Sequence, residues 1–227
     1  NWYEYGDLDY AIRIDTELSY ACLAASQRID ISSRPVNYDG FPIDTGSIVA
    51  TRFLLNGKDI PVVLASNNLY HSPEQTEQLG AMAAECANEL GKRVSVIGVG
   101  GLSGSIFREE IDPRNDRILT PDDDQWNKRM LDLLERGDLN EAAAQAPTYA
   151  TEARADMGFK HLYWILGGTG RQCHGARVHA YGPTYGAGAA VSGASWRCSI
   201  LACGSSTASL RITTPSTCTS IRPSLTR

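Results

Sequence analysis

The sequence predicts an α/β fold, with a largely parallel or mixed central sheet flanked by helices on both faces. The first observation is a pair of short apolar runs rich in β-branched residues, at 60–66 and 93–99, which are typical of buried strands. The second is a helical pattern over 73–90 between them. It opens with Ser72–Gln75, which supplies an N-cap, a proline at the first helical position and a capping-box glutamine, and Gly91 ends it. A strand, a helix and a strand in this order predict a βαβ unit with parallel, adjacent strands.

Further elements follow from cap and stop signals. Thr120-Pro121 opens one helix and Pro147 closes another. A run of apolar residues at 48–55 indicates a strand. Additional helices are expected over four ranges: 16–28, 120–137, 138–146 and 152–166.

Length and composition exclude several classes of protein. The chain has 227 residues and 24.6 kDa, which is enough for one large domain with a real core. Hydrophobic residues make up 42% and charged residues 21%, which is ordinary for a globular protein and wrong for a disordered one. No apolar run approaches the roughly 18 residues of a membrane helix. The net charge of −5 argues against the broad basic surface that nucleic-acid binding requires.

The composition changes sharply after Val191. Residues 192–227 contain 15 Ser or Thr and no acidic residue, and they show neither helical nor strand periodicity. We therefore expect an α/β domain over 1–191 and an atypical tail over 192–227. A basic tail that binds an acidic partner, a non-native end and an adaptable surface arm are all open interpretations of it.

The six cysteines predict no disulfide framework. They contain no Cys-x-x-Cys pair, and the chain is long enough to fold without cross-links. Isolated thiols in a reducing compartment are the expected state, which favours a cytoplasmic location. The cysteines are Cys22, Cys86, Cys173, Cys198, Cys203 and Cys218.

The glycine-rich segment 98–104 follows the second predicted strand, where dinucleotide-binding loops are found. Ser103 occupies the third glycine position of that fingerprint, so the fingerprint fails. The nucleophile-elbow pattern fails as well, because Ser105 stands at its last glycine. We expect a glycine-rich strand end at the carboxyl edge of the sheet, where α/β proteins bind ligands.

No metal site is evident from spacing alone. Asp122, Asp123 and Asp124 fall in the first turn of a predicted helix, where they complement the helix dipole. The histidines have no neighbouring cysteine pair that would complete a zinc site, so we expect them in loops or on the surface. They are His71, His161, His174 and His179.

Several motifs resemble those of the class III extradiol ring-cleavage dioxygenases. The segments 37–46, 60–63 and 97–104 are similar to that family's Asp-His-Gly turn, Ile-Pro-Val strand and Gly-x-Leu-Ser-His strand end. The segments 159–166 and 179–186 resemble the α-type, non-catalytic subunit of the 2-aminophenol 1,6-dioxygenases. The resemblance runs to about Val191.

This resemblance implies a site that has lost its chemistry. Catalytic members hold Fe(II) with two His and one Glu and add a His as acid–base. Here Thr45 stands at the Asp-His-Gly histidine, Gly104 at the acid–base histidine and Lys160 at the carboxylate ligand. These three residues are expected to converge on one vestigial pocket at the carboxyl ends of the strands. No catalytic residue and no metal are expected in this chain.

The implied function is that of a structural subunit. Fe(II) and the bound aminophenol would belong to a homologous catalytic β-type subunit, in an α2β2 assembly that inserts both atoms of O2 into the ring. Two alternatives remain open at this point. The chain could itself be catalytic, with iron bound by histidines upstream of the given sequence and with Asp156 as the carboxylate ligand. It could instead be a small-molecule binding or regulatory module that kept the pocket without the chemistry.

Overall fold

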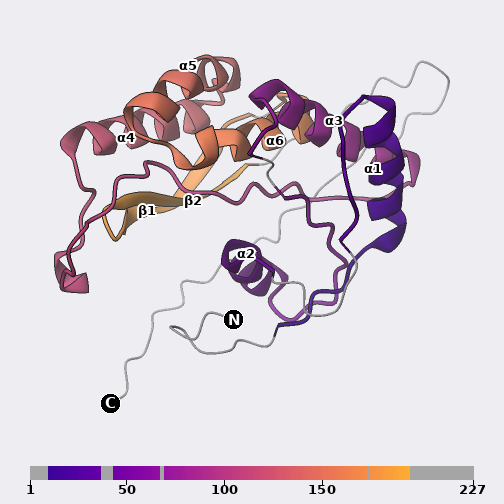
Figure 1. Cartoon of the computed structure of the whole chain (residues 1–227), viewed down its shortest axis with the longest axis horizontal. Coiled ribbons are helices and arrows are strands. Elements are labelled where there is room, and N and C mark those ends of the chain that lie inside the picture. Colours follow the sequence, from indigo (N-terminus) through magenta and orange to yellow (C-terminus); the bar gives the residue numbers. More distant parts are fainter. Residues whose placement is uncertain (1–9, 37–42, 67–68, 173, 195–227) are drawn as a thin grey trace.

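The computed structural model describes residues 10–36, 43–66, 69–172 and 174–194, and these form a mixed α/β structure. In Figure 1, α4, α5 and a two-stranded hairpin lie on one side, α1 and α3 on the other, α6 between them, and α2 apart below. Two short 3-10 helices, η1 and η2, complete the described elements. Their bounds are α1 Thr16–Arg28, α2 Thr45–Leu55, α3 Pro73–Glu89, η1 Pro113–Asn115, α4 Pro121–Arg136, α5 Leu139–Glu152, η2 Asp156–Phe159, α6 Lys160–Thr169, β1 Ala176–Thr184 and β2 Ala187–Ala194.

Three helices confirm the sequence prediction almost to the residue, namely α1, α3 and α4. At α3 the capping box is complete, because Ser72 accepts from the Gln75 N–H at 3.2 Å and Gln75 accepts from the Ser72 N–H at 2.9 Å. At α4, Thr120 caps the N-terminus, and Gly137 ends the helix with φ of 77°. Local cap chemistry therefore sets both ends of these helices.

The strand predicted over 48–55 is wrong, since this segment lies within helix α2. Asp44 decides the conformation, because its carboxylate accepts from the Ser47 N–H at 2.7 Å and so caps the helix. Asn56 ends the helix in the left-handed conformation, with φ of 45°. The β-branched residues Ile48 and Val49 favoured a strand only weakly, and the cap prevailed.

The helix predicted over 138–146 does not stop at Pro147. Helix α5 continues to Glu152 with this proline inside it. A proline lacks the N–H that would bond to the carbonyl four residues earlier, which is that of Ala143. The Tyr163 hydroxyl on α6 donates to this carbonyl at 2.9 Å. A partner from another helix therefore satisfies the acceptor that the proline leaves open.

The helix predicted over 152–166 begins eight residues late, as α6. The chain between α5 and α6 is held in an irregular path by the glycine-rich segment, since the Asp156 N–H donates to the Leu102 carbonyl at 3.0 Å. Phe159 then adopts a left-handed conformation with φ of 59°. A tertiary contact thus overrides the helical pattern here.

The predicted βαβ unit is not seen among the residues that the structure describes. Residues 60–66 and 93–99 follow irregular paths, and no β-ladder joins them in the part of the chain that the structure describes. Val62 instead forms a parallel bridge with Ile14, in which the Asp15 N–H donates to the Val62 carbonyl at 3.0 Å. The central parallel sheet is therefore not shown, although the mixed α/β class is.

Burial explains why the segment 93–99 has the sequence of a strand. Val94 and Val96 are half-buried, while Ile97 and Val99 are exposed. Val96 lies against Gly168 of α6 and Val94 against the cluster around α3. Helices can bury an apolar run without a neighbouring strand, so apolar pattern alone did not establish strand pairing.

The observed sheet is an antiparallel hairpin of β1 and β2 that the sequence analysis did not predict. The two-residue connection Tyr185-Gly186 has φ of 54° and 93°, as in the primed turns that suit hairpins. The Asp116 carboxylate accepts from both N–H groups of this turn, at 2.7 and 2.9 Å. The Tyr185-Gly186 pair is the local sequence signal for the turn. The hydrogen bonds to Asp116 that hold the turn depend on the tertiary structure.

Strand β2 takes in residues 192–194, which we had assigned to the tail. Residues 195–227 lie outside the described part of the chain, as do Cys173, Cys198, Cys203 and Cys218. The predicted resemblance segment 37–46 is described only from residue 43 onward.

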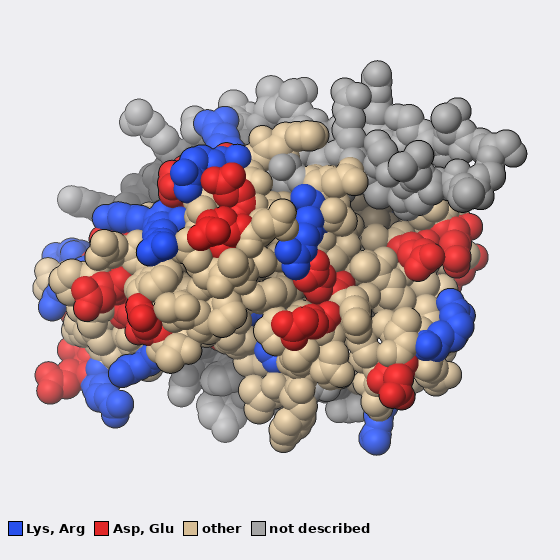
Figure 2. Space-filling view, turned by 90° about the horizontal axis from the view of Figure 1, so that it is seen from above, with Lys and Arg blue, Asp and Glu red and all other residues tan. Residues whose placement is uncertain are grey.

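The buried side chains form two apolar clusters. One joins α4, α5 and α6 around Met130, Tyr149 and Leu166, and the other joins α1 and α3 around Leu18 and Cys86. No helix in the ranges described is both long and apolar enough to cross a membrane. On the face shown in Figure 2, basic and acidic side chains are interspersed, and the described residues present no broad basic patch there.

Candidate functional site

The glycine-rich segment 98–104 is the meeting point of the structural elements that carry the family motifs. Gly46, at the start of α2, lies so close to Val99 that an added Cβ would be 2.6 Å from it. His161, at the start of α6, lies directly against Gly98 and Gly100. The residues next to Thr45 and Lys160 in the sequence therefore reach this segment, which favours the predicted pocket. Convergence of the three side chains themselves stays a prediction.

Gly104 has no room for a side chain. Its N–H donates to the Ala153 carbonyl at 3.0 Å, and a Cβ on it would lie 2.4 Å from the Arg154 carbonyl oxygen. Real Cβ atoms do not approach backbone oxygens so closely. An acid–base histidine at this position would therefore require the backbone to move.

Lys160 is buried, with 6% of its surface exposed, at the first residue of α6. Its ammonium donates to the carbonyls of Leu69 and His71, at 3.1 and 3.0 Å. Burial lowers the pKa of this lysine, because a low-dielectric environment disfavours the charged form. Lys160, which the resemblance predicts at the carboxylate-ligand position, is therefore a hydrogen-bond donor that connects α6 to the chain preceding α3.

Thr45 begins α2, directly after its Asp44 cap. Asp156, the carboxylate of the catalytic alternative, accepts from the Gly101 N–H at 2.9 Å. Within the described ranges, no group of three or more His, Cys, Asp or Glu could hold a metal ion. The Lys160 ammonium could not replace the glutamate among the two His and one Glu that hold ferrous iron in catalytic members.

His161 is not the surface histidine that we expected. Its Nδ1 is buried without a hydrogen-bond partner, and its ring packs edge-on against Phe159 at a centroid distance of 4.6 Å. Burial lowers the pKa of His161 to about 4, although the nearby Asp156 carboxylate acts in the opposite direction. The imidazole is therefore neutral at physiological pH.

Protonation of His161 should destabilise the fold in mild acid. Its ordinary pKa is 6.5 and its native pKa is about 4, so the unfolded chain binds the proton more tightly. Stability is therefore fully present above pH 6.5 and falls as the pH drops toward 4, by about 3 kcal/mol in total. The unfolding free energy, measured with urea at several pH values in this range, should decrease less steeply with falling pH in His161→Gln than in the wild type. The exposed His179→Gln is the matched control, and equal slopes in all three proteins would contradict this assignment.

A buried polar network holds the same segment from the other side. The Asn127 carbonyl on α4 accepts from the Ser103 N–H at 3.0 Å and from the Tyr149 hydroxyl at 2.6 Å. Its amide donates to the Ser103 hydroxyl at 2.9 Å and to Tyr181 at 3.2 Å. Ser103 in turn accepts from the Gly188 N–H at 3.1 Å. Asn127 thus joins the glycine-rich segment to α5 and the hairpin.

No sequence motif predicts this network, because its members are distant in sequence. Burial raises the pKa of Tyr181 to about 12, and it raises that of Tyr149 as well. Both hydroxyls therefore stay protonated and act as donors. Tyr181 donates to Asp124 at 2.6 Å, so one acid of the first turn of α4 has a second role besides complementing the helix dipole.

Replacing Asn127 by alanine should cost about 2–4 kcal/mol of unfolding free energy. The substitution leaves the buried Ser103 N–H and the Tyr149 hydroxyl without their acceptor. Chemical denaturation measures the loss, and the exposed Gln125→Ala on the same helix should lie within about 0.5 kcal/mol of the wild type. A loss below about 1 kcal/mol in Asn127→Ala would count against the network.

Comparison with known proteins shows the family of the chain. The family described as the catalytic LigB subunit of aromatic ring-opening dioxygenase matches residues 2–192. The chain belongs to this family. Membership confirms the resemblance to the class III extradiol dioxygenases that the motifs predicted.

Two relatives refine the relationship within the LigB family. The chain is 48% identical to the 2-aminophenol 1,6-dioxygenase alpha subunit of a Pseudomonas sp over 192 residues, which cover 84% of this chain and 71% of that protein. It is 28% identical to the beta subunit named for the same enzyme, also from a Pseudomonas sp, over 194 residues, which cover 81% of this chain and 64% of that subunit. The chain therefore spans less than two thirds of the beta relative, and it resembles both subunits.

Proposed function

We propose that this LigB-family chain is the structural, non-catalytic subunit of a heteromeric ring-cleaving dioxygenase that acts on a 2-aminophenol. Its partner is a homologous β-type subunit, which carries the Fe(II) and binds the substrate, in an α2β2 assembly. The free thiols of Cys22 and Cys86 fit a cytoplasmic location. The greater identity to the alpha relative than to the beta relative supports this role.

The observation that carries the proposal is the fit of Gly104 against the Arg154 carbonyl. A subunit that performed ring cleavage would need an acid–base group there, and 2.4 Å leaves no space for even a Cβ. Lys160 adds a second, independent argument. A buried ammonium cannot ligate iron, and it repels a cation placed near it.

The two alternatives have weaker support. A catalytic chain would need Asp156 as a ligand, but among the described residues Asp156 belongs to no group of three or more His, Cys, Asp or Glu that could hold a metal ion. A small-molecule binding module would need a cavity at the glycine-rich segment. The cavity described below lies between α1 and α3 instead.

The test is a reconstitution with the β-type subunit. This chain alone should contain far less than one iron per chain and should not consume O2 with 2-aminophenol. Co-expression should yield a complex with an interface well above roughly 1,000 Å², with iron in the β-type chain and with activity at least about tenfold above that of the β-type chain alone. Metal analysis of the separated chains, native mass and O2 uptake measure these outcomes. Full activity of the β-type chain alone, or stoichiometric iron in this chain, would overturn the proposal.

A further inference from the structure

The interface between α1 and α3 contains two cysteines that the proposed function does not use. Cys22 lies on α1 and Cys86 on α3, and both are free thiols. Cys86 is 3% exposed, and Cys22 packs against the same apolar cluster. The Cys86 thiol is near enough to Cys22 to affect the pKa of that residue. The packing of two helices thus brings two thiols that are distant in sequence into one apolar cluster.

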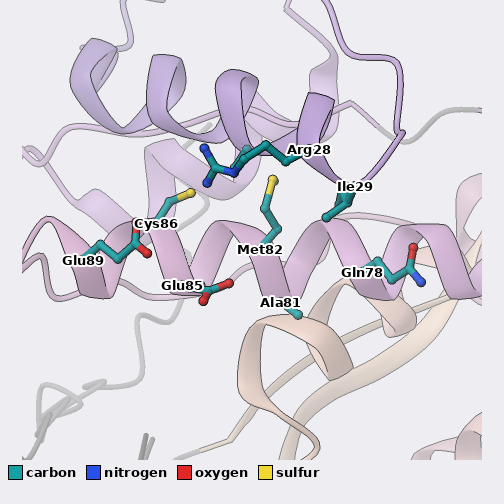
Figure 3. Close-up of a pocket in the computed structure, with 9 residues that line it drawn as sticks. Arg28, Ile29, Gln78, Ala81, Met82, Glu85, Cys86 and Glu89 are labelled. Carbon is teal, nitrogen blue, oxygen red and sulfur yellow. The ribbon is translucent and has the colours of Figure 1, made fainter. Parts of the chain in front are cut away.

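An open cavity of about 480 Å³ lies beside Cys86. It lies between α1 and α3, and Figure 3 shows the Cys86 side chain directed from α3 toward α1 beside Met82. Arg28, Glu85 and Glu89 are among the polar residues around it. Cys86 lines this cavity, so a small polar oxidant can reach its sulfur although the residue is buried.

We propose that Cys22 and Cys86 form a reversible disulfide that links α1 to α3 when the chain meets hydrogen peroxide. The Cys86 thiolate attacks one peroxide oxygen, the O–O bond breaks, and the departing hydroxide takes a proton to become water. Cys86 is then a sulfenic acid. The Cys22 sulfur attacks the Cys86 sulfur, the S–O bond breaks, and the hydroxyl leaves as water with the proton of Cys22. Two thiols are oxidised by two electrons, and one peroxide is reduced to two waters.

The surroundings of the two sulfurs set the order of reaction. Burial, reinforced by the adjacent Cys86 thiol, raises the pKa of Cys22 to about 12. Because the thiolate is the nucleophile, Cys22 is a poor first attacker. Cys86, which faces the cavity, is the sulfur that meets the peroxide, and Cys22 resolves the sulfenic acid. The proposal concerns this chain alone and does not rest on the proposed function.

A disulfide needs the sulfurs about 2.05 Å apart, so the two free thiols must rotate toward each other before they can bond. The neighbouring cavity leaves room for the side-chain rotation that this requires. The bond would close a long loop between residues 22 and 86 and restrict the unfolded chain. The thermal midpoint of the oxidised protein should therefore rise by about 5–10 °C and return after reduction with dithiothreitol.

The direct test is peptide mapping of the full chain after exposure to hydrogen peroxide. Remaining thiols are blocked with N-ethylmaleimide, and the protein is digested with trypsin without reduction. Cys22 lies in the tryptic peptide 14–28 and Cys86 in the peptide 59–92. We expect these two peptides joined, and Cys173→Ser as the matched control should give the same product. Recovery of both peptides unlinked, or linked only to other cysteines, would overturn the proposal.

Two variants test which cysteine reacts first with the peroxide. In Cys22→Ser, the sulfenic acid on Cys86 cannot be resolved, so dimedone should label Cys86 strongly. In Cys86→Ser, Cys22 should be labelled at least about tenfold less. Labelling of Cys22 equal to that of Cys86 would overturn the assigned order. The mapping of the wild-type chain decides the bond itself, whether or not a variant folds.

Discussion

Replacing Gly167 by alanine should destabilise the fold by at least about 3 kcal/mol, well beyond the usual effect of one added methyl group. Gly167 lies where α6 crosses α3, and a Cβ there would be 1.9 Å from the Glu77 carbonyl oxygen and 2.8 Å from the Ala81 nitrogen. Both atoms belong to backbone, so no side-chain rotation relieves the contact. The helices would have to separate along their whole interface.

Helix propensity alone predicts the opposite effect of Gly167→Ala on stability. Alanine in the middle of a helix is favoured over glycine by about 1 kcal/mol. Gly80, on the facing surface of α3, makes the reciprocal approach, with its added Cβ 2.3 Å from the Trp164 carbonyl oxygen. Gly182→Ala is the matched control, because nothing lies within 4 Å of its added Cβ. Thermal and urea unfolding should separate the two variants clearly, and a stable Gly167→Ala would disprove the close crossing.

Replacing Lys160 by glutamate should cost about 3–5 kcal/mol. The ammonium that donates to the carbonyls of Leu69 and His71 would become a carboxylate facing the same two oxygens, at a position only 6% exposed. Neither oxygen can donate a hydrogen bond in return. The buried negative charge would then lack the compensation that the lysine has.

Two comparisons separate charge from packing at this site. Lys160→Met keeps the stem and removes the charge, so it should cost only about 1–3 kcal/mol. Lys128→Glu breaks an exposed pair with Asp124 and should cost about 1 kcal/mol or less. Urea unfolding of the three variants gives the ranking, and a Lys160→Glu as stable as Lys160→Met would contradict the burial of this group.

The same geometry bears on attempts to restore a metal site. Introducing Lys160→Glu together with Gly104→His supplies the residue types of the catalytic family, but the histidine would meet the Arg154 carbonyl. We expect the double variant to be less stable than either single variant and to bind no iron tightly. Metal analysis and unfolding of the purified double variant measure both outcomes.

The sequence by itself determined the elements whose ends are fixed by neighbouring residues. Ser72 with Gln75, and Thr120 with Gly137, set the bounds of α3 and α4 through hydrogen bonds within a few residues of each other. The family was also determined at this level. Its motifs at the glycine-rich segment and at the start of α6 are local strings that the LigB match over 2–192 confirms. The same motifs drew attention to Thr45, Gly104 and Lys160 as residues that differ from the family pattern.

The tertiary structure decided what depends on partners far along the chain. Helix α5 passes through Pro147 because Tyr163 satisfies the freed carbonyl, and α6 starts late because Asp156 is held by Leu102. Segment 93–99 has the apolar, β-branched run that is typical of a buried strand. In the structure, however, Val94 and Val96 of this segment pack against helices. A periodic pattern reports which side chains are buried, and only the fold reports what buries them.

The candidate site divides in the same way. The sequence named Gly104 and Lys160, but only the fold showed that one has no space for a Cβ and that the other donates to two backbone carbonyls. The fold also buries His161, which lowers the pKa of that residue, and it places Cys22 and Cys86 in one apolar cluster. Burial and the approach of distant backbone are properties of the folded chain, because they arise from contacts that residues near in sequence cannot make.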